Sequence, residues 1–81
     1  MTHSFRVTVT RKPGLSDPEG ATTKRALHDL GFSEVGSVSF GRILSLTVDA
    51  EDEEAAREQV EAMCTKLLAN PVMENFTIEA V

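Results

Sequence analysis

The feature that most constrains the fold is a change of hydrophobic period along a chain of only 81 residues. Near the start, Phe5, Val7 and Val9 alternate with polar residues, which is typical of a strand with one buried face. The spacing of apolar residues then becomes helical, returns to alternation, becomes helical again and ends in alternation. With no repeat or linker in the chain, this pattern predicts a single domain over residues 1–81.

The first helix is predicted from its end signals. After the turn at residues 11–14, Asp17 is suited to the N-cap and Pro18 to the first helical position. Gly31 is suited to end the helix, because glycine readily adopts the left-handed conformation found there. We expect Phe32 to fold back onto the last turn. The face expected to be buried contains Ala26, Leu27 and Leu30.

Two strands are predicted between the helices. Val38 and Phe40 fit a second strand, and the alternating Leu44, Leu46 and Val48 fit a third. The dipeptide at residues 41–42 separates these two apolar runs, so we expect a hairpin turn there.

The second helix has the strongest pattern. Five acids within residues 49–54 favour a helix start, because negative side chains complement the free amides and the helix dipole. Asn70 is expected to adopt the left-handed conformation that ends the helix, and Pro71 cannot continue it. The inward stripe is predicted to contain Ala56, Val60, Met63, Cys64 and Leu67. Phe76, Ile78 and Ala80 then predict a final strand.

Together these elements predict an α+β fold with the order β-α-β-β-α-β. We expect a two-layer sandwich in which a four-stranded, mainly antiparallel sheet carries both helices on one face, as in ferredoxin-like proteins.

Charge and composition exclude several classes of protein. A formal charge of −5 argues against binding to nucleic acid, which normally requires a basic patch. The longest apolar run is three residues, so no membrane-spanning segment is predicted. The first residues contain no apolar signal region, and a cytoplasmic protein is expected. Cys64 is the only cysteine, which excludes an internal disulfide and a cysteine-based zinc site.

No residue pattern predicts catalysis or metal binding. Cys64 falls within the apolar stripe and is expected to be a buried structural thiol. His3 is expected in an N-terminal tail and His28 on the exposed side of the first helix, without the spacing of metal ligands. The acids of residues 49–54 are explained as a solvated helix start, and residues 11–14 match neither common phosphate-binding loop.

Three of these segments carry a family resemblance. The sequence Asp17-Pro18-Glu19-Gly20, the pair Gly41-Arg42 and the run KLLANPV at residues 66–72 resemble PurS, the small subunit of phosphoribosylformylglycinamidine (FGAM) synthase. The resemblance extends over nearly the whole chain. The PurS family commonly has Gly-Lys in place of Gly41-Arg42, a change that keeps the charge but alters its geometry.

The resemblance implies an accessory subunit without a catalytic site or a bound cofactor of its own. In that family the complex uses ATP, Mg and glutamine in purine synthesis; a glutaminase subunit releases ammonia and a large synthetase subunit consumes it. The small subunit, as a homodimer or larger homo-oligomer, joins the two and supports ammonia transfer. We expect partner contacts on loops, where binding residues concentrate. The candidates are Asp17, Pro18, Gly20, Gly41, Arg42, Asn70 and Pro71.

Two alternatives remain open on the sequence. The chain could be a ferredoxin-like regulatory module that binds a small ligand at a dimer interface, or a free-standing hydrolase of acyl phosphates. The first would be favoured by one ligand that strongly raises the melting temperature, and the second by activity of the isolated protein.

Overall fold

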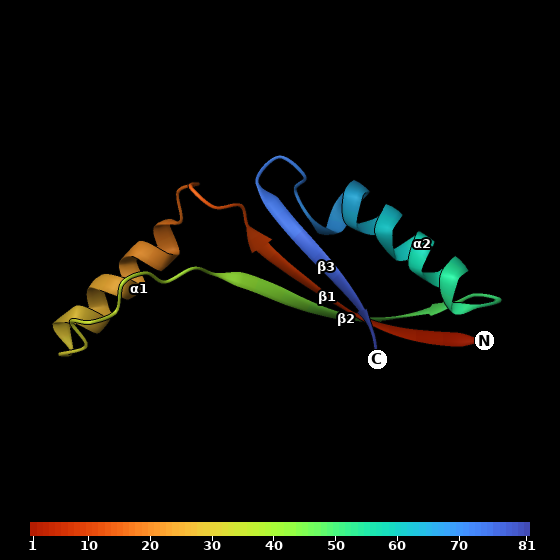
Figure 1. Ribbon diagram of the computed structural model, residues 1–81, viewed down its shortest axis with the longest axis horizontal. Helices are drawn as coiled ribbons and strands as arrows, with labels where there is room; N and C mark the ends of the chain where they lie inside the picture. Colours follow the sequence, from red (N-terminus) through yellow and green to blue (C-terminus); the bar gives the residue numbers. More distant parts are fainter.

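The computed structural model describes all 81 residues as a three-stranded sheet with one covering helix and one projecting helix (Figure 1). The strands are β1 (Thr2–Arg11), β2 (Gly41–Asp49) and β3 (Glu74–Ala80). The helices are α1 (Pro18–Asp29) and α2 (Glu53–Met63), and α2 continues into a π-helical turn, η1 (Cys64–Leu68). No helix is both long and apolar enough to cross a membrane.

The sheet has the order β2-β1-β3, and both pairings are antiparallel. The antiparallel sheet is therefore confirmed, whereas the predicted four strands are wrong. β1 is also longer than predicted and includes His3, which was expected in a tail. In the register, Arg42 lies opposite Val9, and Glu74 lies opposite Arg11. These side chains point to the sheet face that α2 covers, because cross-strand partners share a face.

The predicted strand at Val38 and Phe40 is wrong. Residues 36–40 form no regular structure and run back along α1. A Cβ atom on Gly20 would collide with the carbonyl oxygen of Val38, so the segment touches the helix backbone where only glycine fits. This close contact places Val38 against α1 and away from the sheet.

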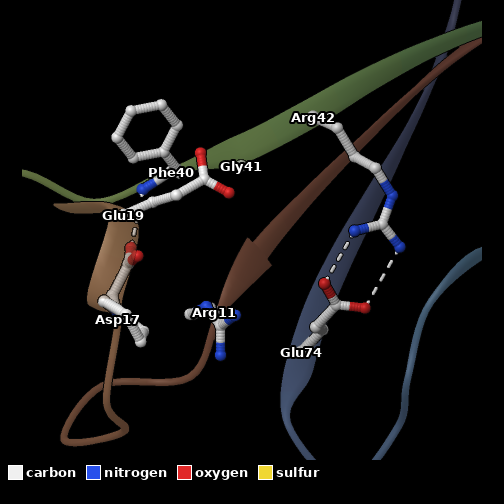
Figure 2. A pocket seen from close by; sticks show the side chains of 8 residues that line it. Arg11, Asp17, Glu19, Phe40, Gly41, Arg42 and Glu74 are labelled. Atoms are coloured by element: carbon white, nitrogen blue, oxygen red, sulfur yellow. Dashed lines mark hydrogen bonds and ion pairs between the residues drawn. The ribbon is translucent and has the colours of Figure 1, made fainter.

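The predicted hairpin at Gly41 and Arg42 is also wrong, because both residues belong to β2, opposite Thr10 and Val9 (Figure 2). Gly41 does not have the positive φ angle that a tight hairpin commonly requires. The absence of a side chain lets the backbone of Gly41 lie close to β1, since a Cβ atom there would be 2.6 Å from the Val9 carbonyl oxygen.

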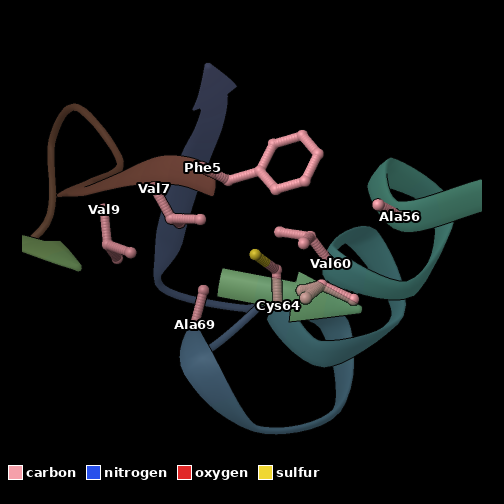
Figure 3. Packing of buried hydrophobic residues seen from close by; sticks show 8 residues of the cluster. Phe5, Val7, Val9, Ala56, Val60, Cys64 and Ala69 are labelled. Carbon is pink, nitrogen blue, oxygen red and sulfur yellow. The ribbon is translucent and has the colours of Figure 1, made fainter. Parts of the chain in front are cut away.

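The core lies between one face of the sheet and the helix α2 (Figure 3). Alternate residues of β1 point into it, as the period of two predicted. Cys64 is fully buried there, which confirms the expected structural thiol, and burial raises its pKa. The buried cluster consists of Phe5, Val7, Val9, Val48, Ala56, Val60, Cys64 and Ala69.

The predicted inward stripe of α2 is wrong at Met63 and Leu67. These residues are 38% and 81% exposed, whereas Leu68 and Ala69 pack on the core. For Leu67 the cause is the π-helical turn, because its wider winding rotates the later residues relative to an α-helix. The left-handed conformation predicted for Asn70 is wrong as well, since only glycines have a positive φ angle. The helix ends instead at Ala69, which has an extended backbone.

The helix α1 projects away from the sheet instead of covering it (Figure 1), so the prediction of both helices on one face is wrong. The Cα radius of gyration is 16.4 Å, against about 12 Å expected for a compact chain of this length. Leu30, expected to be buried, is 74% exposed, and Phe32 is also exposed. We call residues 12–40, which include α1, the arm.

Candidate partner interface

The start of α1 is organised by the carboxylate of Asp17. One oxygen accepts a hydrogen bond from the Gly20 amide at 2.9 Å, which confirms the predicted N-cap, and Pro18 occupies the first turn. The other oxygen accepts from the Phe40 amide at 2.8 Å. These two hydrogen bonds, that from Phe40 foremost, lower the pKa of Asp17. Asp17 therefore joins the two ends of the arm.

The far end of α1 closes as a Schellman motif. Gly31 has a φ angle of 101°, and its amide donates to the His28 carbonyl at 3.0 Å. The Phe32 amide donates to the Leu27 carbonyl at 2.9 Å, so the backbone folds back as predicted. His28 is exposed, as expected, and its Nε2 lies 2.8 Å from the Val35 carbonyl oxygen. These contacts give the arm internal order although α1 does not cover the sheet.

A crevice separates the start of α1 from the sheet (Figure 2). Four of the predicted interface residues line it: Asp17, Pro18, Gly41 and Arg42.

The other three predicted interface residues lie outside the crevice. Gly20 is buried against the Val38 carbonyl and is therefore not a surface residue. Asn70 lies at a second, smaller hollow near the end of η1, and Arg11 and Glu74 line both spaces. Pro71 is exposed on the adjacent loop.

The side chain of Arg42 lines the crevice and also forms hydrogen bonds within the chain. Its guanidinium donates to both oxygens of the Glu74 carboxylate, at 2.7 and 3.1 Å (Figure 2). It also donates to the carbonyl of Leu68. The bond from Arg42, together with one from the Asn70 amide, lowers the pKa of Glu74 to about 2. Arg42 thus makes internal contacts while its side chain stays 48% exposed, and its place among the interface candidates stays a prediction. Glu74 was not predicted, since no local pattern links residues 32 positions apart.

The turn at residues 11–14 is also bound internally. Lys12 donates from Nζ to the Pro71 carbonyl at 2.9 Å, and Arg11 donates to the Ser16 carbonyl at 3.1 Å. No cluster of three or more His, Cys, Asp or Glu side chains could hold a metal ion.

The fold and these contacts define the chain as an extended α+β protein with two open sheet edges, a projecting arm and an exposed loop at the end of η1. Such a surface offers several places for association with other chains.

A family model described as "Phosphoribosylformylglycinamidine (FGAM) synthase", PurS, matches residues 4–81, and the chain belongs to this family. The PurS subunit of FGAM synthase from Synechocystis sp. is 41% identical, over 98% of this chain and 81% of its own length.

Solved structures agree with this assignment. The PurS crystal structure from Methanocaldococcus jannaschii is 40% identical with a TM-score of 0.82, and covers 100% of this chain and 96% of its own. A chain in the structure of PurLQS from Thermotoga maritima is 31% identical with a TM-score of 0.89, and covers 100% of this chain and 99% of its own.

Proposed function

We propose that this chain is the accessory subunit of FGAM synthase, a glutamine-using ligase of purine biosynthesis, and that it joins the large synthetase subunit to the glutaminase subunit. In this proposal the chain carries no catalytic residue, and ATP and Mg are used elsewhere in the complex. The observation that carries the proposal is the likeness to a whole chain of PurLQS, at a TM-score of 0.89. That likeness includes the projecting arm, because the alignment covers 100% of the chain.

The distribution of the exposed apolar side chains supports two separate contact surfaces. The arm exposes Leu30 and Phe32, while Leu67 in η1 and Val72 in the loop that follows it are also exposed. Exposed apolar side chains that gather in patches are typical of association surfaces. We assign the arm to self-association in a homodimer or larger homo-oligomer. A second copy of the chain would bury the apolar residues of α1, which the sheet leaves exposed.

The second surface is the loop at residues 69–73, which we call the tip loop, together with Leu67 beside it. We assign it to the other subunits of FGAM synthase. This assignment retains Asn70 and Pro71 as interface candidates and adds Leu67 and Val72. Asp17, Pro18, Gly41 and Arg42 support these surfaces from within the crevice, and support of ammonia transfer follows from holding the two larger subunits together.

A buried, unpaired thiol at Cys64 is compatible with a reducing compartment, and we place the complex in the cytoplasm. The alternative of a ligand-binding regulatory module is not favoured, because the family match spans residues 4–81 and leaves no part of the chain to a different family.

Assembly tests the proposal directly. The tagged chain, mixed with the large synthetase subunit and the glutaminase subunit, should co-elute with both in gel filtration with ATP, Mg and glutamine. Leu67→Asp should weaken co-elution, because it places a charge in an apolar contact. Elution of the unmodified chain apart from both subunits under all conditions would contradict the proposal.

A further inference from the structure

The end of η1 is capped by a side chain from a distant strand. A helix commonly ends with a left-handed residue that satisfies its last carbonyls, but Ala69 is extended at φ −133° and ψ 150°. The carbonyl of Leu68 instead accepts a hydrogen bond from the guanidinium of Arg42, in β2. Arg42 therefore replaces the local cap that the sequence lacks.

Glu74 extends this cap to the loop that follows. Its Oε1 accepts from Arg42 and also from the Asn70 amide, at 2.7 Å. The Glu74 side chain is only 17% exposed and that of Arg42 is 48% exposed, so the pair is partly shielded from water. Bidentate pairs of this kind are among the stronger and more directional polar contacts. One guanidinium thus links the start of β2, the end of η1 and the start of β3.

The tip loop satisfies its polar groups by local hydrogen bonds, while Val72 stays exposed to solvent. The amides of Met73 and Glu74 both donate to the Asn70 carbonyl, at 3.1 and 2.7 Å, and the Val72 amide donates to Asn70 Oδ1 at 3.0 Å. Val72 is nevertheless 77% exposed, and Leu67, in the preceding turn η1, is 81% exposed. A loop that is well hydrogen-bonded and yet exposes apolar side chains is pre-organised for contact.

We propose that Arg42 is a positioning residue: it acts through Glu74 and the Leu68 carbonyl to hold the tip loop in the shape that the other subunits of FGAM synthase bind, and it does not touch those subunits. This inference rests on the proposed function. It differs from a direct contact role in a measurable way. If Arg42 and Glu74 act through the same interaction, the losses of assembly free energy caused by replacing each of them are not additive.

A double-mutant cycle tests this. Arg42→Met keeps the aliphatic stem but loses the donors, and Glu74→Gln keeps an oxygen for the Asn70 amide but loses the ion pair. The readout is the concentration of this chain that half-saturates glutamine-dependent FGAM formation by the two larger subunits. Each single variant should raise this concentration about tenfold, and the double variant should stay within about threefold of Arg42→Met.

A second readout separates positioning from contact. In the isolated chain, Arg42→Met and Glu74→Gln should speed hydrogen exchange at the amides of Asn70, Met73 and Glu74, while exchange in β1 stays unchanged. Leu67→Ala is the matched contact variant: it should raise the half-saturating concentration without changing exchange in the tip loop. Arg42→Lys should lie between Arg42→Met and the unmodified chain in both readouts, because one amino group cannot reach all three acceptors in the same geometry.

A multiplicative loss in the double variant, of about a hundredfold, with unchanged amide exchange would overturn the inference and make Arg42 a direct contact. Half-saturation unaffected by Arg42→Met would overturn it as well. Failure of the unmodified chain to stimulate glutamine-dependent synthesis would instead refute the proposed function, while the exchange data would still show whether Arg42 orders the tip loop. Circular dichroism verifies that each variant is folded.

Discussion

At the scale of single residues, Asp17 shows how one side chain can serve two segments. Its two oxygens hold the Gly20 amide in α1 and the Phe40 amide at the other end of the arm. The first contact was predictable, since capping is local in sequence. The second joins residues 23 positions apart, and no local pattern indicates it.

Replacement of Asp17 separates these two tasks. Asp17→Asn keeps one oxygen for the helix cap. It cannot accept the second hydrogen bond in the same arrangement, because the side-chain NH2 group that replaces the other oxygen is a donor. We expect Asp17→Asn to speed hydrogen exchange at Phe40 alone and Asp17→Ala to speed it at both Gly20 and Phe40. Amide exchange followed by NMR measures this. Equal exchange rates in the two variants would contradict the assignment.

The lowered pKa of Glu74 predicts how the stability of the fold depends on pH. Its pKa in the folded protein is about 2, below the ordinary value of 4.5, chiefly because of Arg42. A lowered pKa means that its contribution is complete above pH 4.5 and is lost as the pH falls toward 2. Urea unfolding between pH 6 and 2 should therefore show a smaller loss of stability for Glu74→Gln than for the unmodified chain. Parallel curves for the two proteins would contradict the role of the ion pair.

At the scale of elements, β1 and α2 follow their sequence patterns because each buries one face against the other. The pattern fails where the winding changes: η1 turns Leu67 outward, and an i, i+3 and i+4 stripe assumes a constant helical period. It also fails for Val38 and Phe40, whose alternation indicates a strand but which lie along α1. Alternation therefore does not guarantee burial, since Phe40 is 42% exposed.

The core between β1 and α2 should be sensitive to a single polar atom. Cys64→Ser places a hydroxyl in an apolar site without a designated partner and should reduce the free energy of unfolding by about 1–3 kcal/mol. Cys64→Ala has no hydroxyl to leave unpaired and serves as the control. Denaturant titration measures both. We expect glutamine-dependent activity of the assembled enzyme to survive Cys64→Ala, and its complete loss in a folded variant would indicate a chemical role for the thiol.

At the scale of the whole molecule, the chain is 52 Å long and only 14 Å in its shortest dimension. The order of helices and strands was largely predictable, but the position of α1 was not. Its apolar residues Leu27 and Leu30 resemble those of any amphipathic helix, and the sequence does not reveal whether they face the same chain or another one. The exposed arm is the physical reason to expect a homo-oligomer.

Two similarly exposed leucines allow a matched test of the two surfaces. Leu30 lies at the end of α1 and Leu67 in η1, and they are 74% and 81% exposed. Leu30→Asp should shift the isolated chain toward the monomer, because a carboxylate is costly to bury in an apolar contact. Leu67→Asp should leave the oligomer intact. Sedimentation equilibrium measures the mass of each. Dissociation by Leu67→Asp and not by Leu30→Asp would reverse the assignment of the surfaces.

In the proposed function, this chain joins two larger subunits of FGAM synthase and takes no part in the chemistry of either. The most direct measurement compares FGAM formation by the large synthetase subunit and the glutaminase subunit with glutamine or with ammonia as the nitrogen source, each with and without this chain. We predict that the glutamine-dependent reaction requires the chain and that the ammonia-dependent reaction of the large subunit does not. If both reactions proceeded equally well without the chain, the account would be contradicted.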